Sequence, residues 1–180
     1  TALGMLVGFV LSVVSAGTAH AISFAYVSAS DDDAVKKIQL SNNTVVKTIT
    51  VGDGPVGGCL TPNELFFYVP NFNDDTVSVI STTTDTVVAT ITVGDAPHSC
   101  AVTPDGSRVW VTNSAADTFD TIATATNTVA GAAVSVGAAP ARLVISSAGT
   151  FAYISNANAG TVSVVNLTTR AVTATITVGG

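Results

Sequence analysis

Apolar and polar residues alternate over short stretches through most of the 180-residue chain. Residues 76–80 (TVSVI) alternate strictly, and residues 108–113 (RVWVTN) and 86–93 (TVVATITV) are apolar runs bounded by polar turns. Successive side chains of a strand point to opposite faces of a sheet, so this two-residue period predicts β-strands. Val, Thr, Ala and Ser dominate the composition, and β-branched residues pack well on a pleated surface. The pattern predicts an all-β protein.

The strand pattern returns about every 42 residues. Four Val-Gly pairs mark the units and lie 42, 43 and 42 residues apart: Val51-Gly52, Val93-Gly94, Val136-Gly137 and Val178-Gly179. An aromatic residue inside an apolar run keeps nearly the same spacing: Tyr26, Tyr68, Trp110 and Tyr153. Each unit has room for four short antiparallel strands, which together form one blade of a β-propeller.

The predicted blades cover residues 22–52, 53–94, 95–137 and 138–180, and the first is partial because it begins at its second strand. Propellers close with four to eight blades. The chain is therefore either part of a longer propeller or half of an oligomeric ring. In both cases the end blades expose an apolar face that needs a partner, which favours self-association or the remaining blades of a longer chain.

Residues 1–21 differ from the repeats. They form an apolar run that ends in Ala19-His20-Ala21, a sequence that fits the cleavage site of a signal peptide. A retained apolar N-terminal helix and an ordinary core segment are the alternatives. The signal peptide predicts export, to the cell surface or the medium.

The net charge of −6 and the pI of about 4.4 exclude nucleic acid as a partner, because no cluster of Lys and Arg is present to neutralise phosphates. Motifs of nucleophilic catalysis, phosphate binding or zinc binding are also missing from the sequence. We expect no cofactor and no metal, and we predict that the protein is not an enzyme.

The aligned units resemble the YVTN family of β-propeller repeats. The matching stretches are residues 67–71 (FYVPN), 109–113 (VWVTN) and 152–156 (AYISN), with 102–106 (VTPDG) and 93–97 (VGDAP) around them. The resemblance covers residues 22–180 and implies a secreted or cell-surface propeller, usually with seven blades. Propellers resembling this one also include lactonases, lyases and cofactor-bearing oxidoreductases, whose sites lie at the mouth of the channel.

One rim of a propeller carries both the connection between successive blades and the turn between the second and third strands. Ligands are expected there, on loops held by a rigid scaffold. The candidate ligand-binding residues on this rim are Asp53, Asn71, Asp95, His98, Asn113, Arg142 and Asn156. His98 has no second histidine nearby in the repeats, which weighs against metal ligation or base catalysis.

Two further patterns have two interpretations each, and a third is a candidate modification site. Asp31-Asp32-Asp33 is typical of a Ca²⁺ site or of a solvated turn, and a Gly at the equivalent position of the last unit favours the turn. Cys59 and Cys100 are candidates for a disulfide, but they are one residue out of register, which favours two separate buried thiols. Asn42 and Asn166 each begin an N-glycosylation sequon.

Together these observations predict an extracellular or cell-surface scaffold or binding module that presents rim loops to a surface glycan, a protein or a neighbouring subunit. The alternative is a propeller enzyme of the lactonase, lyase or oxidoreductase type, with its site at the channel mouth.

Overall fold

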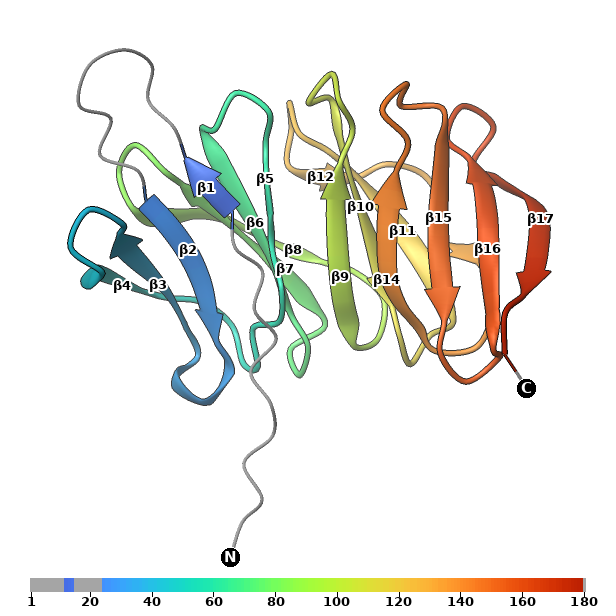
Figure 1. Ribbon diagram of the computed structural model, residues 1–180, viewed down its shortest axis with the longest axis horizontal. Helices are drawn as coiled ribbons and strands as arrows, with labels where there is room; N and C mark the ends of the chain where they lie inside the picture. Colours follow the sequence, from blue (N-terminus) through green and yellow to red (C-terminus); the bar gives the residue numbers. More distant parts are fainter. Residues whose placement is uncertain (1–11, 15–23, 180) are drawn as a thin grey trace, which may run out of the picture.

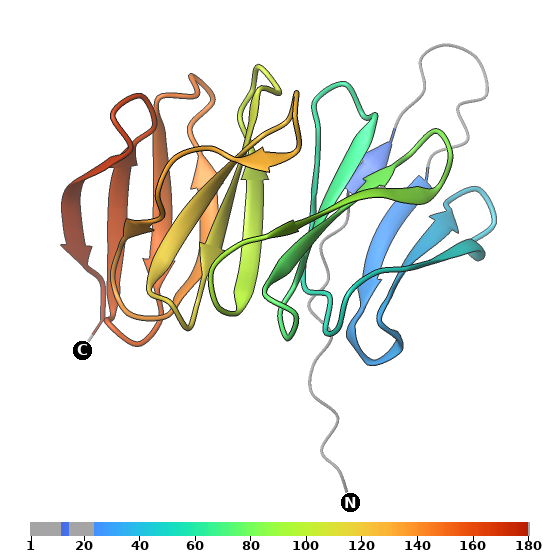
Figure 2. The same cartoon turned by 180° about the vertical axis from the view of Figure 1, so that it is seen from behind.

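Four antiparallel sheets stand side by side in chain order in the computed structural model, which describes residues 12–14 and 24–179 (Figures 1 and 2). The first sheet comprises β1 (Ser12–Val14), β2 (Phe24–Ala29), β3 (Ala34–Gln39) and β4 (Thr44–Thr50), with a 3-10 turn η1 (Ser30–Asp32). The second comprises β5 (Cys59–Leu60), β6 (Phe66–Asn71), β7 (Thr76–Ser81) and β8 (Thr86–Thr92).

The third sheet comprises β9 (Pro97–Val102), β10 (Arg108–Asn113), β11 (Thr118–Ala123), β12 (Thr128–Val129) and β13 (Val134–Ser135). The fourth comprises β14 (Pro140–Ile145), β15 (Phe151–Asn156), β16 (Thr161–Asn166) and β17 (Ala171–Thr177). Consecutive strands pair within each sheet, as in the blades of a propeller. The predicted fold class, an all-β partial propeller of about four blades, is confirmed.

β1 occupies the position of the inner strand that the sequence analysis expected the first blade to lack. Ser12 lies opposite Tyr26, and Val14 lies opposite Phe24. Residues 12–14 belong to an apolar segment that shows none of the repeat's marker residues, so the alignment of units did not reach them. The rest of the predicted signal peptide or N-terminal helix, residues 1–21, lies outside the described residues.

The outer strand of the third sheet is split into β12 and β13, which both pair with β11. Gly131 lies between them with φ +79°, and a Cβ at this position would lie 2.0 Å from Arg170 Nη1. Between β12 and β13 the Arg170 side chain reaches over from the fourth sheet, and its Nη2 donates to the carbonyl oxygen of Ala132.

Three apolar clusters hold neighbouring blades together. The largest side chains of the first interface are Tyr26, Phe67 and Ile80, and those of the third are Trp110, Phe119 and Leu143. The middle cluster joins Tyr68 of the second blade to Val109 and Ile122 of the third. A four-stranded blade has two apolar faces, so burial between blades is the main stabilising contribution of this fold.

Turn residues with positive φ recur at two positions of every blade. Asp33, Asp75, Asp117 and Gly160 occupy the turn between the second and third strands, with φ of 48°, 56°, 56° and 61°. Asn43, Asp85, Asn127 and Arg170 precede the outer strand, with φ of 56°, 54°, 52° and 56°. Asp, Asn and Gly tolerate the left-handed region, which explains why Asp33, Asp75, Asp117 and Gly160 recur at the first of these positions.

Candidate functional site

The three asparagines expected on the ligand-binding rim lie inside the blades. Asn71, Asn113 and Asn156 are buried, and each amide nitrogen Nδ2 donates to hydroxyl or carboxylate oxygens of the next strand. Asn113, for example, reaches Thr118 Oγ1 at 3.1 Å and Asp120 Oδ2 at 2.9 Å. These amides tie the second strand of a blade to the third and present no surface to a ligand.

The glycine of each of the first three Val-Gly pairs packs against one of these asparagines. A Cβ on Gly94 would lie 2.6 Å from Asn113 Nδ2, and a Cβ on Gly137 would lie 2.6 Å from Asn156 Cγ. Gly52 meets Asn71 in the same way, at 2.7 Å. The Val-Gly pair and the terminal asparagine of the aromatic motif therefore recur together because they are in contact.

Asp53 and Asp95 are exposed on the rim. Asp53 Oδ1 accepts a hydrogen bond from Asn73 Nδ2 at 2.7 Å, and its backbone N–H donates to Asp74 Oδ2 at 2.8 Å. Arg142 is exposed on the face of the fourth blade that points away from the third. The structure therefore does not bring Arg142 together with His98.

His98 lines a cavity of about 390 Å³ that receives residues from all four blades, here called the rim pocket. Its wall is mainly apolar and includes Val56, Phe72, Ala141 and Ala157. The volume lies in the range typical of small-molecule sites. Among its lining residues, His98 is the one titratable side chain.

The His98 ring is held by two contacts. Its Nδ1 lies 2.8 Å from the carbonyl oxygen of Ala141, and a carbonyl only accepts hydrogen bonds, so Nδ1 carries the proton. The ring also meets Phe72 edge-on, with centroids 6.1 Å apart. In the neutral imidazole the lone pair is then on Nε2, which is free to accept a hydrogen bond or a proton.

Cys59 and Cys100 form a disulfide between the inner strands β5 and β9, with Cα atoms 5.7 Å apart. The sequence analysis favoured separate thiols because the two residues are one position out of register. That offset is what brings them together: Cys59 lies opposite Tyr68, on the face toward the third blade, and Cys100 lies opposite Val111, on the face toward the second. Residues in equivalent register would both point the same way around the ring.

The sequon asparagines lie on outer turns. Asn42 is exposed and Asn166 is half-buried, and each Oδ1 accepts a hydrogen bond from the backbone N–H two residues on. The glycosylation of either residue stays a prediction.

The tyrosines of the first two units make contacts that the sequence did not predict. Tyr26 Oη donates to Asp85 Oδ1 at 2.9 Å, and Tyr68 Oη donates to Asn127 Oδ1 at 2.6 Å, in each case across a blade interface. Burial raises the pKa of Tyr68 to about 12. For Tyr26, burial and the neighbouring Asp85 carboxylate both raise the pKa. The constant separation of 59 residues in the two pairs was the available signal.

The sequence model of the family described as "Lactonase, 7-bladed beta-propeller" matches residues 20–178. The chain belongs to this family. No curated protein matches the chain. The narrower resemblance to the YVTN repeats stays a prediction.

Two solved structures show the same fold as this lactonase-family chain. Hydrazine synthase from Kuenenia stuttgartiensis superposes with a TM-score of 0.81 at 21% identity, over 85% of this chain and 45% of that one. A functionally unknown protein from Desulfotomaculum acetoxidans DSM 771 gives a TM-score of 0.68 at 20% identity, over 80% of this chain and 47% of that one. The chain thus spans less than half the length of either neighbour.

Two further observations on the lactonase-family chain concern metal-binding groups and membrane-spanning helices. In the described part, His, Cys, Asp and Glu side chains form no group of three or more that could hold a metal ion. Over the same residues, no helix is long and apolar enough to cross a membrane.

Proposed function

We propose that this propeller is an extracellular or cell-surface scaffold whose rim pocket binds a small, mainly apolar molecule. The observation that carries the proposal is the pocket itself: about 390 Å³, built by loops of four blades, with a mainly apolar wall and one titratable side chain, His98, held in a fixed orientation. Small-molecule sites combine an apolar wall with a few oriented polar groups. The ligand would offer a hydrogen-bond donor to His98 Nε2.

Export is supported by the bond between Cys59 and Cys100, because disulfides persist mainly in oxidising compartments. The apolar composition of residues 1–21 agrees with export, although those residues are not part of the described structure apart from β1. Alkylation of the intact protein purified from its natural compartment, followed by mass spectrometry, tests this: two modified cysteines would contradict it.

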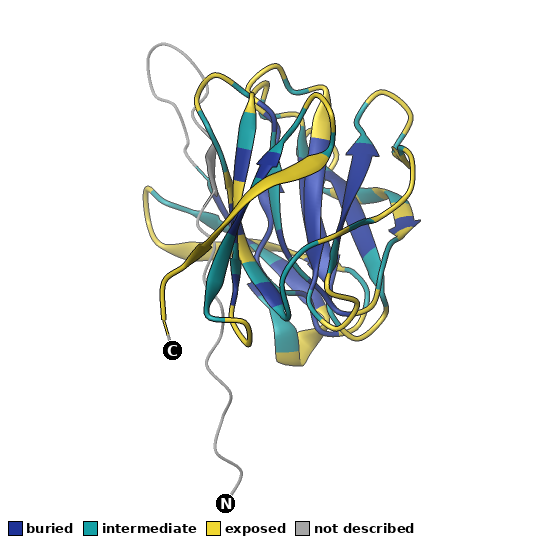
Figure 3. Cartoon of the chain, turned by 90° about the vertical axis from the view of Figure 1, so that its right-hand side faces the viewer, coloured by how far each residue is buried: buried dark blue, intermediate teal, exposed yellow. Residues whose placement is uncertain are grey.

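The scaffold role rests on the outer face of the fourth blade. Tyr153 is 42% exposed there, whereas Tyr26 and Tyr68 at the equivalent positions are 1% and 0% exposed. Val144 and Ile176 extend this apolar face, which Figure 3 shows from the side of β17. We propose that another blade covers it, from a second copy or from the rest of a longer chain. A stable monomer in light scattering would remove the second copy.

The ligand hypothesis is tested with phenol, a compact apolar molecule with one O–H donor, and with benzene, which lacks the donor. We expect millimolar phenol to shift the imidazole signals of His98 in long-range ¹H–¹⁵N spectra, and benzene to bind more weakly. Ala157→Phe fills the pocket and should abolish the shift. Ala116→Phe, on an exposed turn outside the pocket, is the matched control. Equal responses in both variants would overturn the proposal.

Membership of the lactonase family and the lone pair on His98 Nε2 favour a second candidate, hydrolysis of a lactone. In this reaction His98 would take a proton from water as the water attacks the ring carbonyl, and the ring would open to a hydroxy acid. The test is acid release from γ-butyrolactone and δ-valerolactone in a pH-stat, with His98→Gln as the inactive comparison. Equal rates for the two proteins would exclude this role of His98.

A further inference from the structure

One blade interface departs from the pattern that holds the others together. At the first two interfaces a tyrosine hydroxyl donates to an oxygen of Asp85 or Asn127, residues that precede the outer strand of the next blade. At the third interface the equivalent residues are Trp110 and Arg170. An indole N–H and a guanidinium are both donors, so this pair cannot form the corresponding hydrogen bond.

As a result, Trp110 and Arg170 do not pair with each other. An Arg170 Nη2 donates to the carbonyl oxygen of Ala132, in the split outer strand of the third blade. Trp110 Nε1 is buried and has no hydrogen-bond partner within the described residues, and the same holds for Arg170 Nε. An unpaired buried donor costs about 1–3 kcal/mol, so the third interface lacks a stabilising contact that the first two have.

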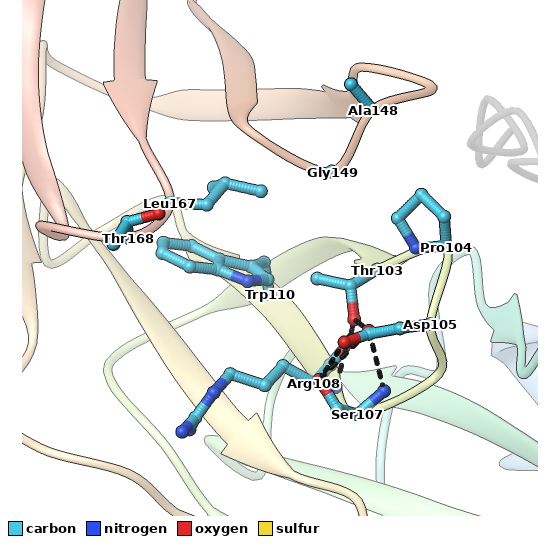
Figure 4. A pocket seen from close by; sticks show the side chains of 10 residues that line it. All are labelled: Thr103, Pro104, Asp105, Ser107, Arg108, Trp110, Ala148, Gly149, Leu167 and Thr168. Carbon is cyan, nitrogen blue, oxygen red and sulfur yellow. Dashed lines mark hydrogen bonds between the residues drawn. The ribbon is translucent and has the colours of Figure 1, made fainter.

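A cavity of about 300 Å³ opens at this interface, here called the interblade pocket. Thr103, Asp105 and Arg108 line one side, Leu167 and Thr168 line the other, and Trp110 lies between them. Figure 4 shows the indole with its nitrogen-bearing ring toward Thr103 and Arg108 and its six-membered ring toward Thr168. The lining turns join first to second strands and third to fourth strands, so the pocket lies on the rim opposite the rim pocket.

The pocket offers both signs of charge and both kinds of hydrogen-bonding group. Hydrogen bonds from Thr103 and Ser107 lower the pKa of Asp105 to about 2, so its carboxylate is charged at neutral pH. Arg108 is exposed, and neither side chain takes part in an ion pair within the described residues. A charged ligand of either sign would be attracted by one group and repelled by the other. A neutral ligand with closely spaced donors and acceptors fits both.

We propose that the interblade pocket binds a neutral pyranose sugar or a single such residue of a glycan. Ring hydroxyls donate to Asp105, accept from Arg108, and exchange hydrogen bonds with Thr168, while Leu167 packs against the ring carbons and the Trp110 indole lies beneath the site. The volume lies at the lower end of ligand sites, which suits one ring rather than an oligosaccharide chain. This site is independent of the rim pocket and of the function proposed for it.

The chain contains its own probe, because Trp110 is its single tryptophan. The indole ¹H–¹⁵N cross-peak therefore reports on this pocket alone. The titrants are methyl α-D-glucopyranoside, methyl β-D-galactopyranoside, methyl α-D-mannopyranoside and N-acetylglucosamine, with glucuronate and glucosamine as charged comparisons. We expect at least one neutral sugar to shift the indole peak to saturation at millimolar concentration, and the charged sugars to bind more weakly.

Two variants locate the site. Asp105→Asn keeps the turn, because Asn63 makes the same hydrogen bonds with Thr61 and the residue two positions on in the second blade. Loss of the charged acceptor should weaken binding about tenfold, the effect of one hydrogen bond to a charged group. Asn63→Asp, the converse change at the equivalent turn, is the matched control and should leave binding unchanged.

The proposal is overturned if no neutral pyranose moves the indole peak, if glucuronate or glucosamine binds more tightly than every neutral sugar, or if Asp105→Asn and Asn63→Asp have equal effects. Retention of the wild-type spectrum outside the pocket shows that the variants fold. Ala148→Phe, which fills the pocket from the opposite turn, should abolish the shift without changing Asp105 or Trp110.

Discussion

Gly94→Ala tests the contact that joins one repeat unit to the next. The added Cβ would lie 2.6 Å from Asn113 Nδ2 and 2.9 Å from its Cγ, so Asn113 would have to move. Overfilling a packed interior costs about 1–3 kcal/mol. Weakening the buried hydrogen bond to the Asp120 carboxylate adds about 1.5–3 kcal/mol, and the stiffer unfolded chain returns about 0.4–1 kcal/mol. We expect a net loss of about 2–5 kcal/mol in the free energy of unfolding.

Urea unfolding followed by the fluorescence of the single tryptophan measures this loss, and the midpoint should fall by about 1–2 M because denaturant slopes are about 1–3 kcal/mol/M. Gly179→Ala is the matched control, since Gly179 ends the equivalent Val-Gly pair and a Cβ there would meet nothing within 4 Å. Its midpoint should stay the same or rise slightly. If the two variants lose equal stability, the contact with asparagine is not the reason for the repeated glycine.

Three more predictions concern stability. Reduction of the Cys59–Cys100 bond, which spans 41 residues, should lower the free energy of unfolding by about 4 kcal/mol in urea titrations with reductant, and the Cys59→Ala/Cys100→Ala variant should not respond to the reductant. Tyr68 stays protonated in the folded chain to about pH 12, whereas an unfolded tyrosine ionises near pH 10, so stability should be complete below pH 10 and decline toward pH 12. Tyr68→Phe should be less stable by about 1 kcal/mol at pH 7 and should lose part of that alkaline decline. Asp105, whose pKa is lowered from 3.8 to about 2, should stabilise the fold above pH 4 and less as pH falls toward 2, a loss that Asp105→Asn removes in acid titrations followed by circular dichroism.

The fold was predictable from the sequence because successive units repeat the same pattern of strands and turns. The strand predicted over residues 108–113 coincides with β10, and the run from 76 to 80 lies within β7. β1 was not predictable in this way, because its three residues carry no repeat marker.

The candidate site was less predictable, because the sequence does not show in which direction each side chain points. Periodicity shows that a residue is in a turn or a strand, but not which neighbouring blade its side chain meets. Asn113 was placed on the rim because it ends a strand, yet its amide turns inward to Asp120. Cys59 and Cys100 were separated by an argument that compared their faces within one blade, whereas a bond between blades requires opposite faces.

His98 and Trp110 show what a repeat alignment does detect. Both are departures from the residues at equivalent positions, and both line cavities. His98 stands out in the sequence because it is the one histidine of the repeats. Trp110 does not stand out in the same way, because an aromatic residue at this position fits the repeat. Its departure becomes clear only when Arg170, which stands at the position of Asp85 and Asn127, is considered with it.

The contact between a glycine and the asparagine of the following unit has a consequence for recombination. If two parent proteins were joined directly after a Val-Gly pair, the glycine and the asparagine that it contacts would come from different parents. A chimeric propeller joined there would combine a glycine with a foreign asparagine, or an asparagine with a foreign side chain that overlaps it. Crossovers placed inside a unit, between its second and third strands, would instead transfer both members from the same parent.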